Sequence, residues 1–144
     1  MTANGHVIRI ELPSSFELVD LVQLLSDRLS AMVGFDEDSL HWVSVAVRES
    51  VINAIKHGNR EDLRKHVIVE FGLTPRQAPT EFSIRVLDEG AGFDPEEIAN
   101  PLDPENILKS SGRGIFFMRS FMDDVSIERR PEGGMSVRMA KKLS

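Results

Sequence analysis

Residues 37–57 have the pattern of one long helix that is apolar around most of its circumference. One apolar stripe recurs at helical spacing, at Val43, Val47, Val51 and Ala54. Further apolar residues lie on other sides of the same helix, at Trp42, Val45, Ala46, Ile52 and Ile55. A helix that packs on one side only is apolar on that side and polar on the other. This helix is apolar over a wider arc, so we expect it to be covered on two sides.

Two polar residues lie within the apolar pattern of this helix. Glu49 and Asn53 are one helical turn apart, so the carboxylate and the amide point the same way. A buried polar group without a partner costs about 1–3 kcal/mol, and a buried charge costs more. A bound metal ion and ligand would supply such partners. The alternative is an ordinary solvated pair on the outside of the helix, since polar pairs at this spacing are common.

The order of the other segments predicts the fold class. Alternation of apolar and polar residues predicts strands at residues 6–12, 66–73 and 81–88, the last two as an antiparallel hairpin. Helical spacing predicts helices at 16–32, 37–57 and 115–122, and a final hairpin is expected over 123–143 with its turn at 131–134. This order favours an α+β two-layer sandwich, with helices on one face of a mostly antiparallel mixed sheet, as a single domain over residues 1–144.

Local signals set the ends of the first two helices. Ser14 and Ser15 follow Pro13 and are expected to stop the first strand and cap the first helix. Gly34 stands where a left-handed residue would end that helix, and Asp36 is expected to open the next one.

Composition narrows the class of function. The formal net charge of −6 argues against general binding to nucleic acid or to an anionic membrane, because both depend on clustered Lys and Arg. The chain has no cysteine and no apolar run near the roughly 18 residues of a membrane span. We therefore expect a cytoplasmic protein without disulfides.

Asp88, Gly90 and Gly92 follow directly on a predicted strand, in the sequence DEGAGFD. The strand end fixes the carboxylate, and the glycines allow the backbone to approach a ligand closely. A carboxylate in this place can accept a hydrogen bond from an exocyclic amine such as that of adenine. The alternative is a plain turn containing Asp and Gly.

A second glycine cluster, SSGRGIFFM, places Gly112 and Gly114 at the start of the helix expected at 115–122. Backbone N–H groups that converge at a helix N-terminus suit phosphate oxygens. Arg113 either assists the phosphates or is solvated. The alternative for the whole cluster is a loop and helix cap.

Together, in this order and spacing, the three motifs resemble the nucleotide-binding boxes of the GHKL ATPase and kinase superfamily. ESVINAIKHGN is similar to the N box, DEGAGFD to the first glycine box and SGRGIFFM to the second. The small size and the sequences NAIKHGN and FMDDV are similar to the bacterial anti-sigma factor serine kinases in particular. The resemblance covers nearly the whole chain, and it implies a Bergerat ATP-binding fold with a lid at about residues 94–113.

By position, the resemblance implies ATP and Mg²⁺ as cofactors and assigns roles to individual residues. Asn53 would be the Mg²⁺ ligand, Asp88 would read adenine, and Glu49 would act as general base on an attacking hydroxyl. The other nucleotide contacts would come from Gly90, Gly92, Gly112, Arg113 and Gly114. The second glycine box departs from the family pattern because it contains no lysine, and Lys109 is the nearest substitute.

The function that this resemblance implies is that of an ATP-dependent protein serine kinase. Such a kinase phosphorylates a small anti-anti-sigma antagonist, sequesters a sigma factor when not bound to that antagonist, and forms a homodimer. Two alternatives stay open, because one scaffold hosts several activities. One is an ATP-binding switch module that transfers no phosphate, and the other is a detached catalytic domain of a sensor histidine kinase.

Overall fold

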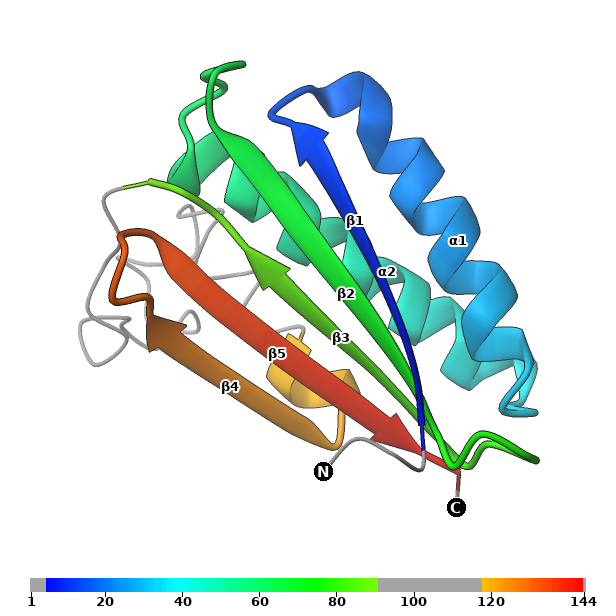
Figure 1. The fold of residues 1–144 in the computed structure, drawn as a ribbon. Helices are drawn as coiled ribbons and strands as arrows, with labels where there is room; N and C mark the ends of the chain where they lie inside the picture. The colour runs from blue at the N-terminus through cyan, green and yellow to red at the C-terminus, as the bar shows by residue number, and fades with distance from the viewer. Residues whose placement is uncertain (1–4, 91–117, 144) are drawn as a thin grey trace, which may run out of the picture.

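The computed structural model describes residues 5–90 and 118–143, which form a five-stranded sheet with helices on one face (Figure 1). The strands are β1 (His6–Pro13), β2 (His66–Thr74), β3 (Glu81–Leu87), β4 (Asp124–Arg129) and β5 (Met135–Lys142). They lie in the order β1-β2-β3-β5-β4. The α+β class and the helical layer on one face are confirmed. The four strand pairings of the described residues are all antiparallel, so this part of the sheet is not mixed.

Both predicted hairpins are present. β2 pairs with β3, and Val69 lies opposite Val86 in their register. β4 pairs with β5 across the turn expected at residues 131–134. The alternation in β2 also has the predicted consequence, because the four apolar residues expected on one face, Val67, Val69, Phe71 and Leu73, are all buried toward the helices.

The first helix is shorter than the pattern suggested. A 3₁₀ turn, η1 (Phe16–Leu18), precedes α1 (Val19–Ala31). Ser15 stands at the cap position of η1, but its side chain makes no cap hydrogen bond, so the predicted serine cap was wrong. Ser14 instead donates from Oγ to the carbonyl oxygen of Lys65, 2.6 Å away, because it faces the start of β2 rather than the helix. Gly34 ends the helical region at a φ of +88°, as expected.

The second helix, α2 (Glu37–Asn53), begins where Asp36 predicted it. The Asp36 carboxylate accepts a hydrogen bond from the Ser39 backbone N–H at 2.7 Å, which satisfies one of the free donors of the first turn. The chain then continues as a π-helical turn, η2 (Ala54–Gly58), rather than as regular α-helix to residue 57. Here the Asn59 N–H donates to the carbonyl oxygen of Ala54, five residues back.

The core lies between the sheet and the helices. In Figure 1, α1 and α2 run side by side on the same face of the sheet. The predicted stripe of α2 faces the sheet, with Val43, Val47 and Val51 each at most 1% exposed. Burying a side chain of this size contributes roughly 1.5–3 kcal/mol. Residues 118–121 are helical, and Phe121 stacks on Trp42 with ring centroids 4.0 Å apart, so α2 is covered on two sides as expected.

Three predictions concern parts of the chain outside the described residues. The lid at 94–113, the start of the helix at 115–122 and the second glycine cluster all lie there. A single domain over residues 1–144 likewise stays a prediction. Within the described part of the chain, no helix is long and apolar enough to cross a membrane.

Candidate active site

A cavity at the C-terminal end of α2 joins two of the three motifs. Asn53 from α2 and Asp88, directly after β3, both line it. The other lining residues come from α2 and η2, from β3 and β5, and from the helical residues after 117; they are Ser50, Ala54, His57, Gly58, Val86, Met118, Met135 and Val137. The fold thus places one amide and one carboxylate, far apart in sequence, on a single mostly apolar cavity.

Asp88 is held firmly in this cavity and is only 5% exposed. Its Oδ1 accepts hydrogen bonds from the backbone N–H groups of Gly90, at 3.0 Å, and Met135, at 3.2 Å. The Asp88 N–H in turn donates to the carbonyl oxygen of Met135 at 3.0 Å. Among the described residues, none donates to Oδ2. One carboxylate oxygen therefore fixes the side chain, and the other is available to a ligand.

Burial raises the pKa of Asp88 above its ordinary value of 3.8, because a charged carboxylate loses its hydration there. The N–H groups of Gly90 and Met135 act against this shift, and the positive charges of Arg130 and Lys65 oppose it less strongly. Arg130 also donates to the Asp88 carbonyl oxygen at 2.6 Å, which ties the β4–β5 turn to the strand end.

Two glycines allow the chain to close around this carboxylate. A Cβ atom on Gly58 would lie 2.5 Å from the Asp88 carboxyl carbon, well inside contact distance. A Cβ on Gly90 would lie 2.5 Å from the carbonyl carbon of Gly58. The π-helical turn therefore packs its backbone directly on Asp88, which only residues without a side chain permit.

Ser50 is a site residue that the sequence did not single out. It lines the cavity and is 2% exposed, and its Oγ has no hydrogen-bond partner among the described residues. A buried hydroxyl without a partner costs free energy, so it is a natural contact for a bound polar group. The signal was weak, because a serine on an apolar helix usually bonds to its own backbone.

His57 also lines the cavity, at the end of the motif helix. Burial lowers the pKa of His57 below its ordinary value of 6.5, and the nearby charge of Lys56 lowers it further. The imidazole is therefore neutral at about pH 7. A neutral ring offers a bound ligand a hydrogen-bond donor and an acceptor rather than a positive charge.

The remaining predicted residues divide into two groups. Glu49 is partly buried one turn before Asn53, but it does not line the described cavity. Gly90 lies beside the cavity, where its N–H holds Asp88. Gly92, Gly112, Arg113, Gly114 and Lys109 lie outside the described residues. In the described ranges, no three His, Cys, Asp or Glu side chains gather into a metal-binding group.

Other contributions to the site were missed because they come from pairing rather than from motifs. Met135, Val137 and Arg130 reach Asp88 or its cavity only because β5 lies next to β3. Gly134 packs on the same residue, since a Cβ there would lie 2.9 Å from Asp88 Oδ1. The order of strands in the sheet was needed to find them.

A larger groove, of about 530 Å³, lies on the open face of the sheet, away from the helices. Gly72, Ser83, Arg85 and Arg138 are among its lining residues. It contains none of the motif residues and no buried polar group. The smaller cavity at Asp88, of about 40 Å³, is therefore the better candidate, because its polar groups converge from separate motifs.

The chain belongs to the family of histidine kinase-like ATPase domains, whose model matches residues 12–141. This finding confirms the superfamily expected from the three motifs. Among curated proteins, the chain is similar to the serine-protein kinase RsbW of Bacillus subtilis, with 27% identity over 100% of this chain and 90% of that protein. It is also similar to the serine-protein kinase RsbW of Staphylococcus aureus, with 29% identity over 99% of this chain and 91% of that protein.

A solved structure has the same fold. The RsbU and RsbW domains of a Mycobacterium tuberculosis protein match 96% of this chain with a TM-score of 0.66 and 17% sequence identity. This chain spans 32% of that longer chain. At this level of identity the likeness supports the fold, and activity has to be argued from the site.

Proposed function

We propose that this protein is an ATP-dependent protein serine kinase that acts as an anti-sigma regulatory factor. It phosphorylates a small anti-anti-sigma antagonist and sequesters a sigma factor. The observation that carries the proposal is the cavity shared by Asn53 and Asp88. The names of the two similar RsbW proteins, both serine-protein kinases that match nearly the whole chain, support it.

The polar groups of the cavity fit an adenine base. Asp88 Oδ2 accepts a hydrogen bond from the exocyclic amine, while Oδ1 keeps its two backbone donors. The Ser50 hydroxyl supplies a further polar contact that the described residues leave unused. A purine is larger than the narrow cavity, so its entry requires wall side chains to move. Met118 and Met135, two of these walls, are suited to this because methionine is unbranched and adaptable.

Asn53 would hold Mg²⁺ through its amide oxygen. A single protein ligand is sufficient, because Mg²⁺ usually keeps several waters and binds the phosphates of its nucleotide. When bound, the ion would neutralise charge on the transferring phosphate. The phosphates themselves would be held by the backbone N–H groups of Gly92, Gly112 and Gly114, with Arg113 as a charged contact. Gly90 would contribute by its N–H bond to Asp88.

Glu49 would be the general base. Being four residues before Asn53, it lies about 6 Å further along the helix axis, on the same side. In phosphotransfer its carboxylate accepts the proton of the substrate serine while the serine oxygen bonds to the γ-phosphorus. The bond between that phosphorus and the ADP oxygen breaks, and ADP leaves.

The test is phosphoserine formation by the purified protein with Mg-ATP and its antagonist. Glu49→Gln is expected to bind ATP with unchanged affinity but to slow phosphotransfer by about 10²- to 10⁴-fold. Glu37→Gln, a matched change in the first turn of the same helix, is expected to leave both unchanged. Equal transfer rates for Glu49→Gln and wild type would exclude Glu49 as the base. ATP binding by the wild type without any transfer would favour the non-catalytic switch.

We further propose that the protein works in the cytoplasm as a homodimer. Within the described sheet β1 is an edge strand, and it exposes the apolar side chains Val7 and Ile8, which are 57% and 37% exposed. Apolar residues on a sheet edge suit an interface between copies. Sedimentation equilibrium would measure the stoichiometry, and a monomer at all concentrations would contradict the dimer.

A further inference from the structure

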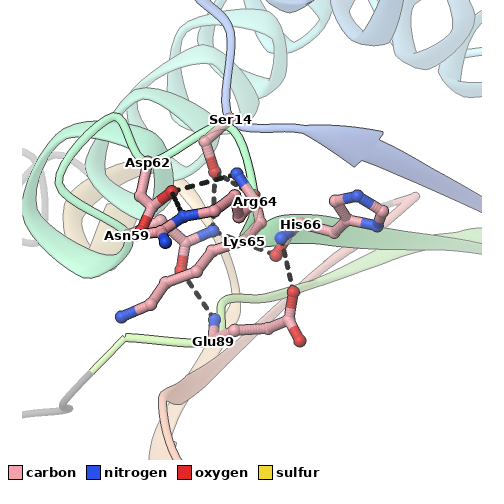
Figure 2. Close-up of polar contacts among 7 residues, drawn as sticks. All are labelled: Ser14, Asn59, Asp62, Arg64, Lys65, His66 and Glu89. Atoms are coloured by element: carbon pink, nitrogen blue, oxygen red, sulfur yellow. Dashed lines mark hydrogen bonds and ion pairs between the residues drawn. The ribbon is translucent and has the colours of Figure 1, made fainter.

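Asn59, directly after the π-helical turn, lies at the centre of a buried hydrogen-bond network (Figure 2). It is 1% exposed. Its Oδ1 accepts from the backbone N–H of Glu89 at 2.7 Å. Its Nδ2 donates to Ser14 Oγ at 2.8 Å and to the carbonyl oxygen of His66 at 3.0 Å. Both amide hydrogens and the amide oxygen are therefore used.

The network joins four separate parts of the chain. Ser14 follows β1, Asn59 follows η2, His66 begins β2 and Glu89 follows β3 by two residues. Ser14 Oγ continues the network to the carbonyl oxygen of Lys65, and the Glu89 carboxylate accepts from the His66 N–H. Figure 2 shows Asn59 between Ser14 on one side and Glu89 on the other.

The position of these bonds relates Asn59 to the nucleotide site. Glu89 is the residue between Asp88, which would read adenine, and Gly90, whose N–H holds the Asp88 carboxylate. Gly58, which packs against that carboxylate, directly precedes Asn59. The bond from Asn59 Oδ1 to Glu89 therefore connects the two chain segments whose close approach shapes the cavity.

Asp88 is fixed on its other side by β5, through the N–H and the carbonyl oxygen of Met135. Without the Asn59 bond, the Glu89 N–H would have no acceptor among the described residues, and the Asn59 side of the strand end would keep only the bond from the His66 N–H to the Glu89 side chain. A misplacement of well under 1 Å is enough to weaken a directional hydrogen bond to a ligand.

We propose that Asn59 is a positioning residue for nucleotide recognition, which sets the place of the Asp88 carboxylate through Glu89. The role rests on the proposed function, because it concerns the nucleotide that Asp88 would bind. Asn59 touches no nucleotide itself. A purely structural role would make Asn59 equivalent to Ser14, its buried partner in the same network.

The test compares Asn59→Ala with Ser14→Ala. Both remove a buried partner from the network, but only Asn59→Ala removes the acceptor for Glu89 N–H. ADP affinity, measured by calorimetry below both unfolding midpoints, is expected to fall about tenfold in Asn59→Ala and to change less than about twofold in Ser14→Ala. Amide hydrogen exchange of Glu89 and Gly90 is expected to accelerate in Asn59→Ala alone.

Equal ADP affinities and equal exchange rates in the two variants would overturn the proposal. If the wild type bound no nucleotide, the proposed function would fail, and the exchange of the Glu89 amide would still decide the role of Asn59. If Asn59→Ala did not fold, amide exchange in the wild type would replace it. The Glu89 N–H is expected to be protected by its bond to Asn59, so rapid exchange of this amide in the wild type would also overturn the proposal.

Discussion

The two ends of the helical segment from Glu37 to Gly58 are built in different ways. At the first end, Asp36 caps α2 from within its own turn, and a Cβ added at the preceding Gly34 would meet nothing within 4 Å. At the second end, the helix widens into η2, and Gly58 packs against Asp88 so closely that a Cβ would overlap the carboxyl group.

The difference separates local structure from long-range structure. The cap bond at the first end joins two residues three apart in sequence, so the stabilisation that it gives is that of one helix turn. The bonds at the second end join Asn59, directly after η2, to Glu89 beyond β3 and to His66 at the start of β2, while Asp88 is bonded to Met135 of β5. We expect substitutions at the first end to change stability alone, and substitutions at the second end to change nucleotide binding.

The largest effect is expected for Gly58→Ala. Its methyl group would push against the Asp88 carboxylate, and overpacking of this kind typically costs about 1–3 kcal/mol. Because the displaced group is the one that would bind adenine, we expect ADP affinity to fall by about 100-fold, measured by calorimetry.

Gly34→Ala is the matched control for Gly58→Ala. It places the same methyl group in open space, where the cost comes only from the positive φ of +88°. We expect thermal unfolding at a lower temperature but an unchanged ADP affinity. If both variants lost affinity equally, the proposed division between the two ends would be wrong.

Asp88→Asn is expected to have the next largest effect, with opposite signs for binding and stability. An amide oxygen is a weaker acceptor than a carboxylate, so ADP affinity should fall about tenfold. The neutral side chain also avoids the unfavourable burial of a charge. The free energy of unfolding of the Asp88→Asn variant at about pH 7, measured by urea titration, should therefore equal or exceed that of the wild type.

The pH dependence follows from the raised pKa of Asp88. Since the folded state binds this proton more tightly than the unfolded state, the contribution of Asp88 to stability is fully present below the ordinary pKa of 3.8. It is lost as the pH rises through the raised folded pKa. The stability advantage of Asp88→Asn over the wild type should therefore grow from acidic to neutral pH, and a difference that shrinks with rising pH would contradict the assignment.

The same contrast explains how far the sequence was informative. The Asp36 cap, the Gly34 stop and the alternation of β2 were predictable because each depends on neighbours along the chain. Asn53 and Asp88 were predictable as a pair only through the motif order. The π-helical turn, the bond of Asn59 to Glu89 and the contact of Arg130 with Asp88 were not, because each depends on how separate strands and turns meet in space.

The smallest effect is expected for Asp36→Ala, at the end of α2 away from the cavity. The variant loses the acceptor for the Ser39 N–H, and the loss of such a cap corresponds to a fall of roughly 2–4 °C in Tm for a chain of this size. The Ser39 hydrogen bonds lower the pKa of Asp36, so this contribution is present above pH 3.8 and is lost as the pH falls through the lowered folded pKa. Asp36→Asn retains an acceptor oxygen and should recover part of the Tm.

Because α2 has 17 residues, the cap lies roughly 25 Å from Asn53, and ADP affinity should stay unchanged in both variants. A loss of affinity at this distance would mean that the two ends of the helix are coupled, and the separation between a stabilising end and a binding end would not hold.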